Sequence, residues 1–134
     1  MGAMELGRMT ETPKAGGTEI PAAYLVVLRH VLVAEDIAMT IAEFDPAASV
    51  VTVASPAEAP AALEGVERLA VAFIAEGPRD YAGSALERAV AQRGGRVVLI
   101  GEQAEAEGEA LGYEVLARPF STGNLLVHLA GKPG

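Results

Sequence analysis

The sequence contains no cysteine and no tryptophan, and lysine occurs only as Lys14 and Lys132, near the two ends of the chain. Without thiols there can be no disulfide, no cysteine nucleophile and no cysteine-based zinc site. Neither a glycine fingerprint for dinucleotides nor a phosphate-binding loop with its Gly-Lys-Ser/Thr signature is present. The two histidines, His30 and His128, are too few and too widely separated to indicate a metal site. The sequence therefore points away from the common catalytic chemistries, and we expect no enzymatic activity.

Long hydrophobic runs and excess positive charge are also missing. The apolar run near the start, residues 24–28, is interrupted by Arg29 and His30 and is far shorter than the roughly 20 residues that cross a bilayer. Residues 1–20 do not have the pattern of a secretory signal. The formal net charge of -8 disfavours nucleic-acid binding, which requires basic side chains around the phosphates. We expect a cytoplasmic protein with neither a membrane nor a nucleic acid as partner.

The chain has 134 residues, of which 51% are hydrophobic, and this predicts one folded domain. Residues 1–22 are rich in Gly, Thr, Pro and Glu, so we expect a flexible extension. A further methionine at Met9, after Met1 and Met4, suggests that the first eight residues are an artificial leader. The domain is predicted over residues 23–131, with a short tail at 132–134.

Strand and helix patterns alternate through this domain. The first strand is predicted at residues 30–34 and the first helix at 37–44, ended by Asp45-Pro46. Further strands are predicted at 49–54, 69–74, 96–100 and 114–116, and further helices at 56–67, 81–93, 103–111 and after the cap residue Ser121. Such a pattern predicts an α/β fold, a flavodoxin-like, doubly wound parallel sheet of five strands in the order 2-1-3-4-5. Residues 24–28 either extend the first strand backwards or pair with a second molecule.

An acidic pair, Glu35-Asp36, follows the predicted first strand. In doubly wound sheets, ligands bind beyond the carboxyl ends of the strands. Two neighbouring carboxylates there can bind a hard cation such as Mg²⁺. They can equally cap the following helix and complement its dipole. Both interpretations of the pair remain open.

The acidic pair after the run Val31-Leu32-Val33-Ala34, together with Arg118-Pro119-Phe120 near the other end, resembles the frame of a bacterial response-regulator receiver domain. The resemblance covers about residues 30–130. It implies transfer of phosphate from a histidine kinase to an Asp that ends the third strand. It also implies Mg²⁺ at the acidic pair, a Lys before the late proline and a hydroxyl residue after the fourth strand.

Three positions depart from that pattern. Alignment of the third strand places Ala75 at the phosphoacceptor position, within one residue either way. Gly101 stands where the hydroxyl residue is usual, and Arg118 replaces the lysine with a larger planar cation. We therefore predict a divergent pseudo-receiver, with degenerate acceptor and switch positions and at most a vestigial Mg²⁺ site.

Two acidic residues near the third strand are possible substitutes for the missing acceptor, Glu76 and Asp80. Glu76 either pairs with Arg118 and imitates a permanently phosphorylated state, or is an ordinary solvated side chain. Asp80 either accepts phosphate or begins the next helix. Arg118 has two further candidate partners, the neighbouring carbonyls and the acidic pair Glu35-Asp36.

The predicted function is that of a non-phosphorylatable receiver domain in a two-component system, acting through protein contacts. The predicted contact surface comprises the fourth helix, the fifth strand and the fifth helix. Its partner would be a histidine kinase, another regulator or a second copy of the chain. Acidic residues on the fourth helix (Glu102, Glu105, Glu107 and Glu109) form either a solvated face or a dock for a basic partner. Two alternatives are a receiver phosphorylated at a non-standard acidic residue and a small-molecule-binding flavodoxin-like domain.

Overall fold

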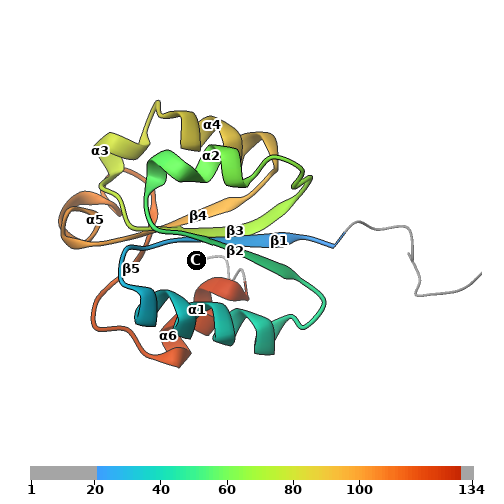
Figure 1. Ribbon diagram of the computed structural model, residues 1–134. Coiled ribbons are helices and arrows are strands. Elements are labelled where there is room, and N and C mark those ends of the chain that lie inside the picture. The colour runs from blue at the N-terminus through green and yellow to red at the C-terminus, as the bar shows by residue number, and fades with distance from the viewer. Residues whose placement is uncertain (1–20, 131–134) are drawn as a thin grey trace, which may run out of the picture.

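The computed structural model describes residues 21–130, which contain one parallel sheet with the strand order β2-β1-β3-β4-β5 (Figure 1). The strands are β1 (Ala23–Val27), β2 (Ser49–Val53), β3 (Leu69–Ile74), β4 (Arg96–Ile100) and β5 (Glu114–Leu116). The predicted fold class and strand order are confirmed. The predictions of an N-terminal extension and leader at residues 1–22 and of a tail at 132–134 fall almost entirely outside the described residues.

Helices cover both faces of the sheet. They are α1 (Val31–Phe44), η2 (Pro56–Glu58), α2 (Ala59–Ala62), α3 (Pro78–Tyr81), α4 (Ala85–Gln92), α5 (Glu102–Glu107) and α6 (Thr122–Leu129). Figure 1 shows α1 and α6 on one face and α2, α3 and α4 on the other. Side chains alternate across each strand: Leu25 and Val27 pack towards α2 and α4, whereas Tyr24 and Val26 pack towards α1 and α6. The central strands β1, β3 and β4 are therefore largely buried on both faces.

The prediction for the first strand and first helix is wrong. Residues 24–28, which the sequence left unplaced, contain most of β1, a strand paired with β2 on one side and β3 on the other. As a central strand it has no open edge for a second molecule. Residues 30–34 instead form the N-cap and first turn of α1, which buries Ala34, Ile37 and Ile41 at helical spacing. Val31 and Leu32 are 66% and 76% exposed, so this apolar run is not a core strand.

The predicted third helix, residues 81–93, is α4 (Ala85–Gln92) in the structure, and only its first residue, Tyr81, belongs to the separate short helix α3. Gly83 adopts a positive φ of +79°, a non-helical conformation that separates α3 from α4. Ser84 then caps α4, and its hydroxyl accepts a hydrogen bond from the Glu87 N–H at 3.1 Å. The Gly83-Ser84 pair followed by Glu87 is typical of a helix N-terminus. The helical periodicity of the surrounding residues extended the predicted helix through it.

The second and fourth helices are shorter than predicted. The second consists of a 3-10 turn, η2, and the short α2, in which Pro60 lies in the first turn, where a missing N–H costs no hydrogen bond. Ser55 does not cap it through its side chain, and its hydroxyl donates to Glu58 at 3.1 Å instead. The fourth helix, α5, ends at Glu107, before Gly108.

The fifth helix, α6, begins after Ser121 as predicted, with a capping box between Ser121 and Asn124. Leu125 and Leu129 are buried, but Leu126 is 37% exposed. The contrast follows from helical geometry, because adjacent residues point about 100° apart.

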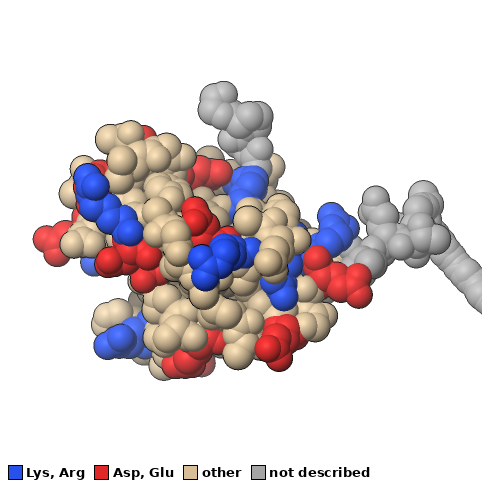
Figure 2. Space-filling view, turned by 90° about the horizontal axis from the view of Figure 1, so that it is seen from above, with Lys and Arg blue, Asp and Glu red and all other residues tan. Residues whose placement is uncertain are grey.

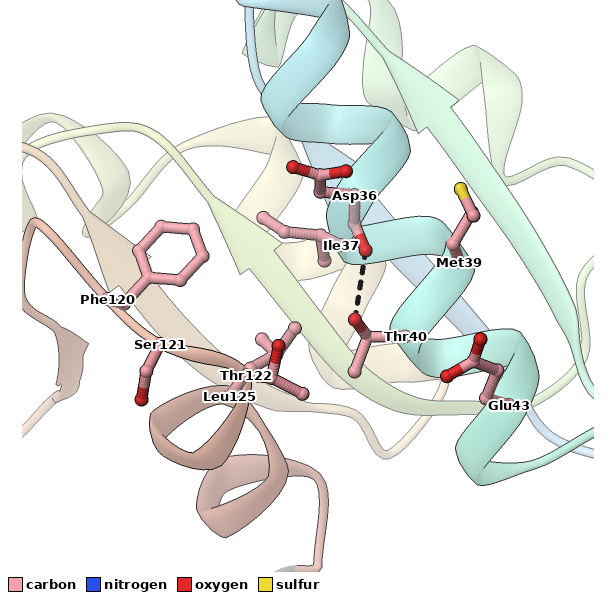
Figure 3. Close-up of a pocket in the computed structure, with 9 residues that line it drawn as sticks. All are labelled: Asp36, Ile37, Met39, Thr40, Glu43, Phe120, Ser121, Thr122 and Leu125. Atoms are coloured by element: carbon pink, nitrogen blue, oxygen red, sulfur yellow. Dashed lines mark hydrogen bonds between the residues drawn. The ribbon is translucent and has the colours of Figure 1, made fainter.

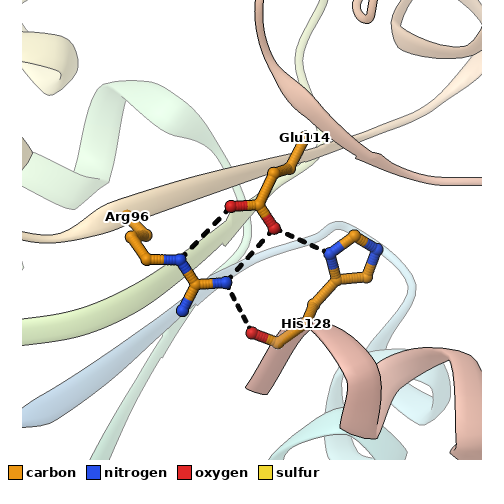
Figure 4. Close-up of polar contacts among 3 residues, drawn as sticks. All are labelled: Arg96, Glu114 and His128. Carbon is orange, nitrogen blue, oxygen red and sulfur yellow. Dashed lines mark hydrogen bonds and ion pairs between the residues drawn. The ribbon is translucent and has the colours of Figure 1, made fainter. Parts of the chain in front are cut away.

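A polar network holds the end of α6 at the amino edge of the sheet (Figure 4). Arg96 donates to both Glu114 oxygens at 3.2 Å and to the His128 carbonyl at 2.6 Å, while the His128 ring lies 2.9 Å from Glu114. Burial by itself would raise the pKa of Glu114, but the hydrogen bonds from Arg96 and His128 outweigh it and lower that pKa. His128 thus anchors α6, a role that its isolated place in the sequence did not indicate.

Seen from the side of α2, α3 and α4, the surface has acidic and basic side chains interspersed among uncharged ones (Figure 2). One ion pair, Arg79 with Glu107 at 3.0 Å, joins α3 to α5. Within residues 21–130, no helix is both long enough and apolar enough to span a bilayer.

Candidate functional site

A cavity of about 550 Å³ lies at the carboxyl ends of the strands, on the side of the sheet that α1 covers. We call it the carboxyl-edge cavity. Its lining comes from the end of β1 (Leu28, Arg29, His30), from α1 (Val33, Asp36), from the ends of β3 and β4 (Ala75, Ile100, Gly101) and from the loop after β5 (Arg118, Pro119, Phe120). Parallel strands bring these segments, distant in sequence, to one edge of the sheet.

The structure brings together three of the predicted site positions, Ala75, Gly101 and Arg118, around this one cavity. Ala75 follows β3 and donates its N–H to the Val27 carbonyl at 2.9 Å, which places it beside the end of β1. Gly101 follows β4 with a positive φ of +123°. The small side chains at 75 and 101 leave the space that the cavity occupies.

The acidic pair is not at the end of a strand, contrary to the prediction. Glu35 and Asp36 are exposed residues in the second turn of α1. Consecutive helical residues point about 100° apart, and the two line different hollows: Asp36 the carboxyl-edge cavity, Glu35 a neighbouring one beside β2. Leu28, Arg29 and His30 occupy the end of β1 instead. The described residues contain no group of three or more His, Cys, Asp or Glu side chains suited to a metal ion.

Arg118 pairs with an acidic residue that the sequence did not single out for it. Its Nε and its backbone N–H donate to the same oxygen of Glu105 on α5, at 2.8 and 3.0 Å. The side-chain hydrogen bond from Arg118, and then the backbone one, lower the pKa of the Glu105 carboxyl. Within residues 21–130, Arg118 forms no hydrogen bond with Glu76, the acidic pair or the neighbouring carbonyls, which the sequence had left open as candidate partners. Two of the four acidic side chains on the predicted docking face, Glu105 and Glu107, are held in ion pairs within the chain.

Glu76 is partly buried, and no cation pairs with it among residues 21–130. It follows Ala75, and one of its oxygens, Oε1, is buried without a hydrogen-bond partner among the described residues. Burial raises the pKa of this carboxyl, and the nearby charge of Asp80 raises it further. Asp80 is exposed in the first turn of α3, in keeping with its predicted place at a helix start.

Replacement of Glu76 by glutamine is expected to stabilise the protein at neutral pH by about 1 kcal/mol, because the variant no longer buries an unpartnered charge. The folded-state pKa of Glu76 is raised, so the cost of its ionised form is absent at low pH and develops as pH rises through that pKa. The gain should thus shrink below the ordinary glutamate pKa of about 4.

Urea unfolding of the wild type and of Glu76→Gln, from neutral pH down to below about pH 4, measures this difference in unfolding free energy. The exposed Glu109→Gln is the matched control, and its unfolding free energy should stay within about 0.5 kcal/mol of the wild type. A loss of stability in Glu76→Gln at neutral pH would mean that the carboxylate has a stabilising partner.

A second hollow, the α1–α6 groove of about 300 Å³, adjoins the cavity and shares Asp36 and Phe120 with it (Figure 3). Thr40 and Glu43 of α1 line one side, and Ser121, Thr122 and Leu125 the other. The Thr40 hydroxyl donates at 3.0 Å to the carbonyl of Asp36, which lies in the preceding turn of the same helix. Figure 3 shows the Asp36 carboxylate on the side of α1 that faces Phe120.

No family model and no curated protein matches this sequence. Among solved structures, the chain is similar to the crystal structure of a putative response regulator from Chloroflexus aurantiacus J-10-fl, with a TM-score of 0.57 and 17% sequence identity. The match covers 84% of this chain and 97% of the other. The fold is receiver-like.

Proposed function

We propose that this chain is an atypical receiver domain of a two-component signalling system, which acts through protein contacts and is not switched by aspartyl phosphorylation. One observation supports this most directly: the ends of β1 and β3 at the cavity carry Leu28, Arg29, His30 and Ala75. Aspartyl phosphorylation requires a carboxylate nucleophile. A Mg²⁺ ion that assists the transfer requires oxygen ligands. Among residues 21–130, Asp36 is the one carboxylate that lines the cavity, and it comes from α1.

The switch positions support the same proposal. Gly101 has no hydroxyl with which to follow a phosphoryl group, and the Arg118 guanidinium is already held by Glu105. A receiver-like domain that lacks both the phosphoacceptor and the hydroxyl switch residue can still signal through contacts made by its surface. We therefore propose a non-enzymatic role, in the cytoplasm.

The proposed contact surface comprises α5, β5 and α6. Leu126 and Val127 of α6 are 37% and 56% exposed, and Leu111, in the turn between α5 and β5, is 46% exposed. Apolar side chains at a surface favour protein contacts. A histidine kinase, another regulator or a second copy of this chain is the proposed partner.

Incubation with a small phosphodonor and Mg²⁺, followed by intact-mass measurement, tests the proposal. We expect the protein to keep its unmodified mass, because the phosphoacceptor position is occupied by Ala75, which has no carboxylate nucleophile. A stoichiometric adduct of one phosphoryl group would contradict the proposal. The variants Asp80→Asn and Glu76→Gln, treated in parallel, would then show which of the two substitutes accepts the phosphate.

A further inference from the structure

We propose that the carboxyl-edge cavity binds a small molecule with an anionic headgroup and a short apolar body. This inference goes beyond the proposed function, since it concerns a ligand and does not depend on which protein the domain contacts. It is carried by the division of the cavity wall into an apolar part and a basic part.

The apolar part of the wall lies against the strand ends. Ile100 is only 3% exposed, and Leu28, Ala75 and Phe120 pack against the same core cluster. Cavities that bind small molecules have volumes of roughly 300–1,000 Å³ and are mainly apolar, with a few polar groups that orient the ligand. At about 550 Å³, this cavity falls within that range.

The basic part of the wall is exposed, and it consists of Arg29, His30 and Arg118. Five other arginines, Arg79, Arg88, Arg93, Arg96 and Arg118, donate to oxygen atoms of this chain. Arg29 donates to no oxygen atom within residues 21–130. Its guanidinium therefore retains its full set of donors for the two oxygens of a carboxylate or a phosphate.

Arg118 adds to this basic part despite its ion pair. Its side-chain bond to Glu105 uses Nε, which leaves the N–H groups of its terminal nitrogens for a ligand. Asp36 is the opposing charge in the lining. Glu105 balances the charge of Arg118, so the available donors of Arg29 and of the Arg118 terminal nitrogens, and not an excess of positive charge, favour an anion.

The experiment uses the full chain labelled with ¹⁵N and four probes that share an eight-carbon chain: octanoate, octyl phosphate, octylamine and 1-octanol. We expect at least one of the two anions to produce saturable shifts at the Ala75 and Gly101 amides. The uncharged alcohol should bind roughly tenfold more weakly, because it cannot form charge-assisted hydrogen bonds, and the amine more weakly still. The two anionic probes separate a carboxylate ligand from a phosphate ligand.

Four variants test the assignment of the wall. Arg29→Gln should weaken binding of the anion roughly tenfold, and Asp36→Asn should strengthen it a few-fold, because the two variants change the charge in opposite senses. Ala75→Leu should abolish binding, since the larger side chain fills the cavity. Arg88→Gln removes the same charge on the opposite face of the sheet and should leave the affinity unchanged.

Three results would overturn the inference: the absence of saturable shifts with either anion, equal affinity for octanol, or equal losses in Arg29→Gln and Arg88→Gln. Both arginines are exposed, so this comparison stands even if Ala75→Leu does not fold. Failure here would leave the phosphodonor result untouched, which keeps the two proposals separable.

Discussion

Arg93→Ala is expected to lower the free energy of unfolding by about 2–3 kcal/mol, although Arg93 is a charged residue at the end of a helix. Its guanidinium donates to the carbonyls of Val66 and Ala89 at 2.8 Å and of Leu63 at 3.0 Å. It thereby joins the end of α4 to the connection between α2 and β3. Alanine would leave these half-buried carbonyls with fewer donors.

Urea unfolding monitored by circular dichroism measures this loss. Arg93→Lys should recover only part of it, because an ammonium group lacks the planar arrangement of donors that reaches three carbonyls. The matched control is the exposed Arg88→Ala, which loses one hydrogen bond to Gly83 at 3.1 Å and should change stability by about 0.5 kcal/mol or less. Equal losses in Arg93→Ala and Arg88→Ala would show that the three carbonyl contacts do not stabilise the fold.

Four of the five strands and their order could be predicted from the sequence, because each is a short apolar run between helical patterns. The first strand could not. Residues 30–34 are as apolar and as β-branched as a buried strand, and a run of this length does not distinguish a strand from a helix start. The decisive signal was the spacing of Ala34, Ile37 and Ile41, which continues one helical face back into the run.

Because the first strand was predicted at the wrong residues, the acidic pair was also predicted at the wrong place in the fold. Glu35-Asp36 was the main landmark for the resemblance to receivers, yet both residues lie within α1. Ala75, Gly101 and Arg118 were placed correctly at the cavity because each follows a strand whose end was predicted correctly. The partner of Arg118 could not be predicted, because Glu105 lies 13 positions away and reaches it only once α5 has packed beside β5.

The packing of α5 against β5 leads to the second large prediction, a loss of roughly 2 kcal/mol in Gly108→Ala. A Cβ atom at Gly108 would lie 2.6 Å from the Ala104 carbonyl oxygen and 2.6 Å from Val115 Cγ2. Both distances are shorter than van der Waals contact. The carbonyl belongs to the backbone of α5 and Val115 to β5, so relief of the clash must move the helix away from the strand.

That movement should also reach the candidate site, because α5 carries Glu105 and the chain after β5 carries Arg118. We expect the Arg118 Nε–H resonance in ¹⁵N spectra of Gly108→Ala to shift towards the position of an unpaired guanidinium. Gly123→Ala is the matched control: its Cβ would meet only Ser121 Oγ, at 3.6 Å, and alanine in a helix should stabilise by about 0.5 kcal/mol. An Arg118 resonance unchanged in Gly108→Ala, despite the loss of stability, would mean that the ion pair at the cavity forms independently of the packing of α5.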